Sequence, residues 1–184
     1  MADAPAAFEV RTAAQLRVLN APKRMELITM LREAGPSTAV DLAQRMGLRP
    51  EALHYHLREL ERIGVVREAG RKATGRRPQT VFELLAERVR LPSGIGTPSI
   101  EREKARGCRL LLRRTEREVS KAFAARSSGT AGTLRVTRDV VRLSDRDRAT
   151  LQSKLAEIDR FLRERDRAGQ PHRLSVTMVV APAM

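Results

Sequence analysis

The chain has 184 residues and a mass of 20.6 kDa, and its 36 lysines and arginines exceed its 22 acidic residues to give a net charge of +14. Its single cysteine, Cys108, excludes an intramolecular disulfide framework and a cysteine-rich metal site. No apolar run approaches the ~20 residues that a membrane helix needs, and the N-terminus shows no secretory signal. The composition therefore predicts a soluble, cytoplasmic protein, in which 41% hydrophobic residues suffice for a core.

The positive charge indicates a polyanionic partner. Arginine is far commoner than lysine, a bias that a GC-rich coding sequence also produces, but the field of such a protein attracts polyanions whatever its origin. Nucleic acid is favoured over an acidic membrane surface. Because the chain has only four Phe, one Tyr and no Trp, it offers few side chains on which unpaired bases could stack. Duplex DNA is therefore the expected polyanion.

A stretch rich in Pro, Gly and Ser at residues 91–99 predicts a linker or an exposed loop. We expect two domains, one over residues 8–85 and a C-terminal region over residues 86–184. Up to Leu85 the chain has 14 basic and 10 acidic residues, and beyond it 22 and 12. The net charge is therefore +4 in the first part and +10 in the second.

Four helices are predicted before residue 65. The first is amphipathic and spans residues 11–19, and the second begins at Pro22 and ends at Gly35-Pro36. A third helix is capped by Ser37 or Thr38 and closed by Gly47. The fourth covers residues 50–63, with Pro50 at its start and Gly64 just after its end.

A basic β-hairpin follows the helices, with strands predicted at residues 65–67 and 80–84. From Arg67 to Arg77 the sequence has five basic residues and one acidic residue. Such a loop is favoured beside phosphates, where binding releases counterions; the alternative is an ordinary solvated loop. Three helices around a tight turn and then a hairpin are the order of a winged helix-turn-helix. We therefore expect a winged helix-turn-helix DNA-binding domain over residues 8–85, followed by a C-terminal α/β region over residues 86–184 for dimerisation or effector binding. The predicted fold class is mostly α with a small β component.

The fourth helix has two distinct faces at ~100° per residue. Leu53, Leu57 and Leu60 share the inward face, and the outward face carries Glu51, Tyr55, Arg58 and Arg62, flanked by His54 and Glu59. Arginine can bond guanine or phosphate, and Tyr or His can bond a base edge. We expect His54, Tyr55 and Arg58 to read bases. The expected phosphate ligands are Arg62, Arg71, Lys72, Arg76 and Arg77. An amphipathic surface helix with solvated charges is the alternative.

The segment from Thr12 to Leu84 resembles the ArsR-type family of bacterial winged-helix transcriptional regulators. The resemblance rests on the string from Ser37 to Leu48 and on Ala52-Leu-His-Tyr-His-Leu-Arg-Glu-Leu-Glu-Arg-Ile-Gly-Val-Val66. It implies that the fourth helix is the recognition helix, with His54 and Tyr55 near bases. It also implies a homodimer on an imperfect palindrome with half-sites about one helical turn apart.

Two departures from the family pattern matter. Many members have Ser or Thr at the cap of the recognition helix, where Arg49-Pro50 stands here; the capping hydroxyl is lost, but Pro50 can still start the helix. Metal-sensing members place a Cys pair in the helix corresponding to residues 41–46, and this chain has none there. The resemblance therefore does not imply metal sensing.

The C-terminal region is predicted to contain a long helix over residues 97–126. Its apolar stripe suggests dimerisation, packing on strands of its own chain, or effector binding; the residues are Cys108, Leu111, Leu112, Thr115, Val119, Ala122 and Phe123. For dimerisation we single out Leu111, Leu112, Val119 and Phe123. Strands are expected at residues 134–143 and 174–180. Between them, Ser144 caps a helix with an apolar face formed by Leu151, Leu155, Ile158 and Leu162.

Catalytic and metal chemistry is not predicted. His54 and His56 are two residues apart on a helix and point in different directions, so we expect His56 to pack as a structural residue. His172 has no partner in sequence, and Cys108 is expected in the core. No phosphate-binding loop or dinucleotide fingerprint occurs. The sequence predicts a non-enzymatic, dimeric DNA-binding regulator that acts as a repressor, without cofactor or metal. The alternatives are a sequence-indifferent architectural DNA-binding protein and a winged-helix protein-interaction module.

Overall fold

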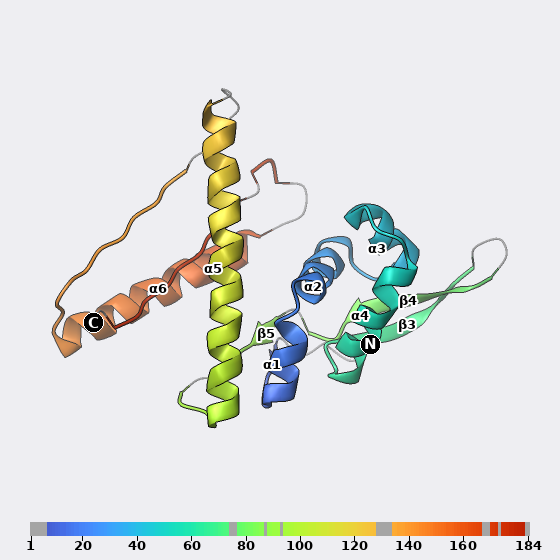
Figure 1. Ribbon diagram of the computed structural model, residues 1–184, viewed down its shortest axis with the longest axis horizontal. Coiled ribbons are helices and arrows are strands. Elements are labelled where there is room, and N and C mark those ends of the chain that lie inside the picture. The colour runs from blue at the N-terminus through green and yellow to red at the C-terminus, as the bar shows by residue number, and fades with distance from the viewer. Residues whose placement is uncertain are drawn as a thin grey trace. The chain divides into compact units, whose positions relative to one another are not determined.

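The computed structural model describes residues 7–73, 77–86, 88–92, 94–127, 134–166, 170–172 and 174–182. The chain divides into two compact units, residues 1–114 and residues 115–184. Figure 1 shows the helices and strands of both units, coloured along the chain. The division falls inside the long helix α5 (Pro98–Ser127), whereas the sequence suggested a boundary between residues 85 and 86. The first part of α5 thus belongs to the N-terminal unit.

The N-terminal unit begins with two helices whose ends follow from local sequence. Helix α1 (Ala13–Leu19) starts with a capping box, in which the backbone N–H of Gln15 donates to Thr12 Oγ1 at 3.1 Å and the side chain of Gln15 accepts from the backbone of Thr12. Helix α2 (Pro22–Ala34) has its proline at the first turn, where no backbone N–H is needed. It ends at Gly35, whose positive φ of 71° suits glycine.

Helices α3 and α4 form the helix-turn-helix pair. Thr38 caps α3 (Ala39–Met46) by accepting from the backbone N–H of Asp41 at 3.1 Å. Gly47 ends that helix in the left-handed conformation at φ 62°. Helix α4 (Glu51–Arg62) follows after a short turn, with Pro50 in place of a hydrogen-bonding cap. The four predicted helices of the first part are therefore confirmed.

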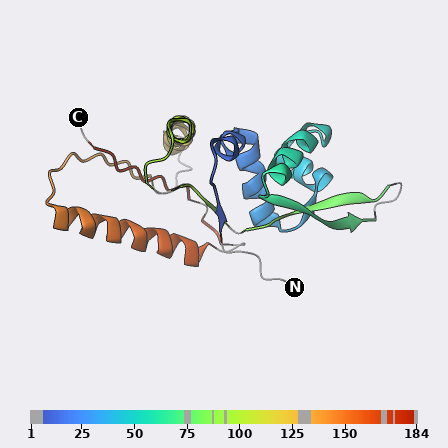
Figure 2. The ribbon, with the colours of Figure 1, turned by 90° about the horizontal axis from the view of Figure 1, so that it is seen from below.

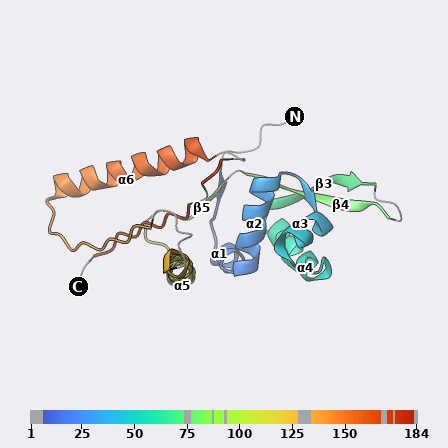
Figure 3. The ribbon, with the colours of Figure 1, turned by 90° about the horizontal axis from the view of Figure 1, so that it is seen from above.

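A three-stranded antiparallel sheet completes the winged helix-turn-helix. Its strands β2 (Ser37–Thr38), β3 (Val66–Lys72) and β4 (Gln79–Leu84) lie in the order β2-β4-β3. Helices α2, α3 and α4 gather on one side of this sheet, and the β3–β4 hairpin projects beyond them (Figures 2 and 3). The sheet supplies the wing, and the predicted fold class, mostly α with a small β component, is confirmed.

A second, two-stranded sheet brings distant segments of the N-terminal unit together. Strand β1 (Phe8–Glu9) pairs in parallel with β5 (Val89–Arg90). The backbone N–H of Phe8 donates to Arg88 O at 2.7 Å, and that of Val10 donates to Arg90 O at 2.9 Å. The sequence analysis did not predict this short sheet, because two-residue strands leave no periodic pattern.

One hydrophobic core holds the N-terminal unit together. Its leucines and isoleucines come from every helix before the hairpin; the fully buried ones are Leu16, Leu27, Ile28, Leu42, Leu53, Leu57 and Leu60. Each such side chain contributes about 1.5–3 kcal/mol when removed from water. This core fixes the orientation of α4, because its inward leucines can be buried in only one rotation of the helix.

The C-terminal unit contains the end of α5 and helix α6 (Asp145–Arg165). Ser144 caps α6, accepting from the backbone N–H of Asp147 at 3.1 Å and donating from its hydroxyl to Asp147 Oδ2 at 2.6 Å. The long helix and the capped helix predicted for this region are both confirmed. Neither α5, α6 nor any other described helix is long and apolar enough to cross a membrane.

Two strand predictions in the C-terminal unit were wrong. Residues 134–143 and 174–180 are extended, but within the described residues neither segment forms a strand. Alternating apolar side chains favour an extended backbone, but a strand also needs a paired neighbour. Apart from Leu134, which is partly buried, the large apolar side chains of these segments remain exposed, including Val136 and Val140. The α/β character expected for residues 86–184 is therefore reduced, in the described part of this range, to two helices and the short strand β5.

Candidate nucleic-acid interface

Helix α4 presents a polar face away from the core. Leu53, Leu57 and Leu60 are fully buried, whereas His54, Tyr55 and Arg58 are exposed. Tyr55, the only tyrosine of the chain, has 63% of its surface exposed. These three residues, predicted from the sequence as base-reading, therefore occupy one accessible helix face. An exposed face of this kind has the dimensions to enter a major groove.

Arg62 lies at the end of α4 and is engaged within its own helix. Its Nε donates to Glu59 Oε1 at 3.1 Å and its Nη2 to Glu59 Oε2 at 3.0 Å, so the two side chains form a bidentate pair. The hydrogen bonds from Arg62 lower the pKa of Glu59, and those to Glu59 raise the pKa of Arg62. A phosphate approaching Arg62 must therefore compete with, or share, an existing carboxylate partner.

His56 faces α2 rather than the exposed side of α4. It is half-buried, and its ring meets that of Tyr55 edge to face with centroids 5.5 Å apart. Burial, followed by the positive charges of Arg24 and Lys23, lowers its pKa. The imidazole is therefore held neutral near pH 7, in agreement with the structural role predicted for it.

The hairpin brings basic side chains to the strands of the wing. Arg71 and Lys72 lie near the far end of β3, opposite Thr80 and Gln79 of β4, and both side chains are exposed. Arg77 is also exposed, whereas Arg76 lies outside the described residues. The wing thus offers a set of cations next to the helix-turn-helix pair.

Lys72 also connects the wing to helix α3. Its Nζ lies 3.6 Å from Asp41 Oδ2. Hydrogen bonds from the backbone and side chain of Thr38 are the main cause of the lowered pKa of Asp41, with a smaller effect from Lys72. The carboxylate of Asp41 therefore takes part in the N-terminal cap of α3 and also pairs with Lys72 at the end of β3.

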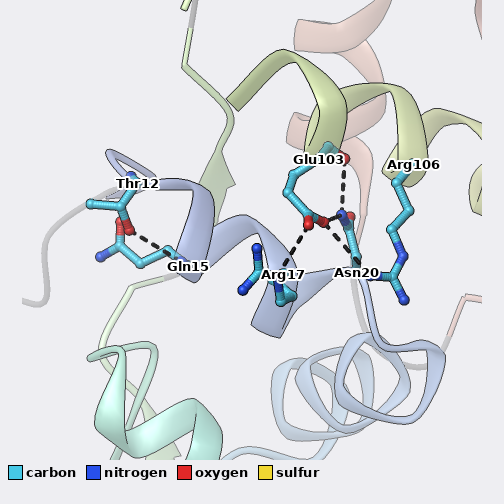
Figure 4. Close-up of polar contacts among 6 residues, drawn as sticks. All are labelled: Thr12, Gln15, Arg17, Asn20, Glu103 and Arg106. Carbon is cyan, nitrogen blue, oxygen red and sulfur yellow. Dashed lines mark hydrogen bonds and ion pairs between the residues drawn. The ribbon is translucent and has the colours of Figure 1, made fainter. Parts of the chain in front are cut away.

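A polar joint between α1 and α5 was not anticipated from the sequence (Figure 4). Asn20 Nδ2 donates to the backbone oxygen of Glu103 at 2.9 Å and to Glu103 Oε2 at 3.1 Å. Arg17 Nε donates to Glu103 Oε1 at 3.2 Å, and Arg106 Nη1 lies 3.9 Å from Glu103 Oε2. Although burial raises the pKa of Glu103, the hydrogen bonds from Arg17 and Asn20 outweigh it and lower that pKa.

Gly107 makes this joint possible. A Cβ at that position would stand 2.6 Å from Asn20 Oδ1, too close for a side chain to fit without movement. The only sequence signal was a glycine in the middle of a predicted helix, which usually has a packing reason. The joint attaches the first turns of α5 to α1, whose Leu16 packs in the same hydrophobic core as the leucines of α4.

The apolar stripe of α5 is largely uncovered. Leu111, Leu112 and Phe123 are each about half exposed, at 47%, 45% and 55%, and Val119 is partly buried. Cys108, expected in the core, is instead exposed, so the described part of the chain leaves that side chain of the stripe uncovered. The described residues contain no cluster of three His, Cys, Asp or Glu side chains that could hold a metal ion.

One family of known proteins matches the part of the chain that contains α4. Residues 18–69 match the family described as Helix-turn-helix domain, a span that contains α2, α3, α4 and the start of β3. The chain therefore carries a helix-turn-helix domain. No curated protein matches the chain.

Several solved structures show a partial likeness. The transcriptional regulator homologue protein from Pyrococcus horikoshii OT3 is 23% identical, with a TM-score of 0.34 over 54% of this chain and 86% of that one. A mutant of ZitR from Lactococcus lactis in apo form is 14% identical, with a TM-score of 0.31 over 78% and 84%. MepR, a transcription regulator of the Staphylococcus aureus multidrug efflux pump MepA, is 14% identical, with a TM-score of 0.28 over 81% and 87%.

Proposed function

We propose that this chain is an ArsR-like bacterial transcription regulator that binds duplex DNA as a homodimer in the cytoplasm and acts as a repressor. The observation that carries the proposal is the exposed face of α4, with His54, Tyr55 and Arg58 on a helix that the core holds in a fixed rotation. That helix is the second of the helix-turn-helix pair within the matched span, the position of a recognition helix.

In this proposal the contacts to base edges come from α4, and most of the contacts to phosphates come from the wing. Arg58 forms no hydrogen bond or ion pair with the described part of the chain, so its guanidinium is available for a base edge. Arg71, Lys72, Arg76 and Arg77 contact phosphates, which fixes the position of the domain but carries no sequence information. Arg62 contributes a phosphate contact through a guanidinium that Glu59 already orients.

Dimerisation is assigned to the exposed stripe of α5, with Leu111, Leu112, Val119 and Phe123 at its centre. Two copies would then present two α4 helices to successive major grooves of an imperfect palindrome. The joint at Glu103 supports this arrangement, because it attaches α5 to the unit that carries α4. No cofactor, metal or catalytic role is part of the proposal.

The proposal is tested by fluorescence anisotropy with the DNA upstream of the protein's own gene and with a shuffled duplex, over a series of salt concentrations. We expect the upstream fragment to bind tighter by ~10³ or more, the lower end for specific regulators. Equal affinities with a steep salt dependence would replace the proposal with a sequence-indifferent architectural protein. Absence of binding to any duplex at low salt would favour a protein-interaction module.

Two variants separate base reading from phosphate binding. Arg58→Ala should reduce the preference for the upstream fragment, whereas Arg71→Ala should weaken both duplexes equally and reduce the salt slope by about one. Arg11→Ala, which removes the same charge from an exposed position before α1, is the matched control and should change neither. An equal loss on both duplexes for Arg58→Ala would contradict its assignment to bases.

A further inference from the structure

Helix α5 carries a row of arginines on one face. At ~100° per residue, four arginines fall within ~60° of the helix circumference and extend over about 16 Å of its axis. We call them the arginine row; they are Arg102, Arg106, Arg109 and Arg113. All four side chains are exposed, and all four residues belong to the N-terminal unit. From residue 102 to residue 114 the helix has six basic residues and one acidic residue, Glu103, so this side of α5 is strongly positive.

Most of the arginine row has no partner within the described part of the chain. Arg106 Nη1 lies 3.9 Å from Glu103 Oε2, at the edge of the polar joint. Arg102, Arg109 and Arg113 form no hydrogen bond or ion pair with any described residue. Three guanidinium groups of the row are therefore available to an anion from outside the chain.

The spacing within the row is unfavourable for an isolated helix. Neighbouring members are three or four residues apart, where like charges on a helix repel each other. By contrast, the exposed Arg62 of α4 has Glu59 three residues before it and pairs with that carboxylate. In α5, Glu116 lies three residues after Arg113, but these two side chains form no ion pair. A bound anion would relieve the repulsion that the helix itself does not offset.

The joint between α1 and α5 determines the direction in which the row points. Glu103 accepts hydrogen bonds from Arg17 and Asn20 of α1 (Figure 4), and Gly107 lies against the same asparagine. Glu103 and Gly107 are turned by ~90° and ~130° around α5 from the middle of the row, so packing on α1 leaves the row uncovered. Leu111 of the apolar stripe lies on the side of α5 opposite the row. Dimerisation through that stripe would therefore not cover the arginines.

The chemistry of the row matches the sugar–phosphate backbone of duplex DNA. Guanidinium groups bind phosphate oxygens in a bidentate manner, and each strand of a duplex offers a phosphate about every 3.4 Å along the helix axis. Between residues 102 and 114, the arc of α5 that holds the row contains only the four arginines. It has no apolar side chain of the kind that a membrane-bound helix buries, and no aromatic ring on which an unpaired base could stack. The row therefore fits duplex phosphates better than it fits a membrane or a single strand.

We propose that the arginine row is a second duplex-binding surface, which contacts DNA phosphates in addition to the contacts made by α4 and the wing. Contacts to phosphates carry no sequence information, so the row adds affinity for any duplex and leaves the choice of sequence to α4. The inference rests on the duplex binding of the proposed function, but it does not depend on base reading by α4 or on dimerisation.

The first experiment measures the salt dependence of duplex binding by the full chain, using fluorescence anisotropy. The row variant combines Arg109→Gln with Arg113→Gln and should weaken binding to the upstream and the shuffled duplex by the same factor. Its slope of log K against log [salt] should fall by about two, because each lost phosphate contact removes ~0.9. Arg146→Gln combined with Arg163→Gln removes the same charge from exposed positions of α6 and, as the matched control, should keep the wild-type slope. An unchanged slope for the row variant would overturn the inference.

The second experiment locates the contact on α5. In a Cys108→Ser background, Ala105→Cys places the only thiol of the chain at an exposed position beside the row. An iron chelate attached to that thiol generates hydroxyl radicals, which should cut the backbone of the bound upstream duplex. Absence of cutting in a complex whose formation anisotropy confirms would show that DNA does not lie along the row, and would overturn the inference.

The outcomes separate this inference from the proposed function. Cooperative unfolding followed by Tyr55 shows that the N-terminal unit is folded in each variant. If wild type binds both duplexes equally and the row variant lowers the salt slope, only the sequence-reading function fails. If wild type prefers the upstream duplex and the row variant keeps its slope, only this inference fails, and binding to neither duplex overturns both.

An acidic membrane surface is the competing partner for the row. It is tested with vesicles of equal parts phosphatidylserine and phosphatidylcholine, to which wild type and the row variant are added without DNA. Vesicle binding that the row variant loses, together with unchanged duplex binding by that variant, would assign the row to lipid headgroups and overturn the inference. Loss of duplex binding in the row variant without vesicle binding by wild type supports it.

Discussion

The two units of this chain contain similar helices but differ in how those helices are stabilised. In the N-terminal unit, α2, α3 and α4 bury a continuous leucine and isoleucine core. In the C-terminal unit, α6 is longer and is capped by Ser144, yet it buries none of its side chains. Capping and amphipathic spacing therefore specify a helix in both units, but only the first unit has a neighbouring apolar surface to pack against.

The largest expected effect is the contrast between a fully buried leucine of the N-terminal unit and a leucine on the apolar face of α6. Leu57→Ala removes a fully buried side chain and should lower the free energy of unfolding by about 2–5 kcal/mol. Leu155→Ala, at the corresponding inward position of α6, should leave unfolding of the N-terminal unit unchanged. Urea unfolding followed by Tyr55, which lies on α4, measures this stability. Similar losses for both variants would mean that the two units share one core.

A smaller effect is expected at the joint that attaches α5 to α1. Gly107→Ala would place its Cβ against Asn20 Oδ1, and overpacking of this kind costs about 1–3 kcal/mol. In an Asn20→Ala background the clash disappears, and the same substitution should stabilise α5 by up to ~1 kcal/mol, because alanine favours a helix interior more than glycine. A double-mutant cycle with urea unfolding measures the reversal of sign. Equal effects in both backgrounds would show that Asn20 does not approach Gly107.

The smallest effect is the pH dependence at His56. Because the folded state lowers its pKa, the unfolded chain binds the proton first as the pH falls through 6.5. The free energy of unfolding is therefore unaffected by His56 above pH 6.5. It falls as the pH drops from 6.5 to the lowered pKa of His56 in the folded state. Urea titrations between pH 7.5 and 5 check this, in a range above the titration of the paired carboxylates. His56→Gln should flatten the slope; an unchanged slope would show that the pH dependence does not come from His56.

Much of the N-terminal unit could be predicted from local sequence signals. Thr38 and Gly47 marked the ends of α3, and the spacing of Leu53, Leu57 and Leu60 predicted which face of α4 is exposed. These features depend on residues within one or two helical turns. The pairing of Arg62 with Glu59 depends on the same helical spacing and could have been predicted from the sequence.

Other features depend on contacts that sequence patterns do not encode. The joint connects Asn20 to Glu103, 83 residues apart, and its only signal in the sequence is a glycine, Gly107, in the middle of α5. Cys108 lies on an apolar stripe, so it was expected in the core, but a stripe specifies only that some partner covers it. The extended segments at 134–143 and 174–180 were predicted as strands for the same reason: alternation indicates a face to be buried and does not identify its neighbour.

The central claim, that the exposed face of α4 meets DNA, is tested most directly through Tyr55. As the only tyrosine in a chain without tryptophan, it is a natural fluorescent reporter on that face. The measurement is acrylamide quenching of its emission, with and without a saturating concentration of the upstream duplex. The account predicts a clearly lower quenching constant in the complex, because bases and sugars cover the phenol ring. An unchanged quenching constant in a complex whose formation anisotropy confirms would show that DNA binds elsewhere, and would contradict the account.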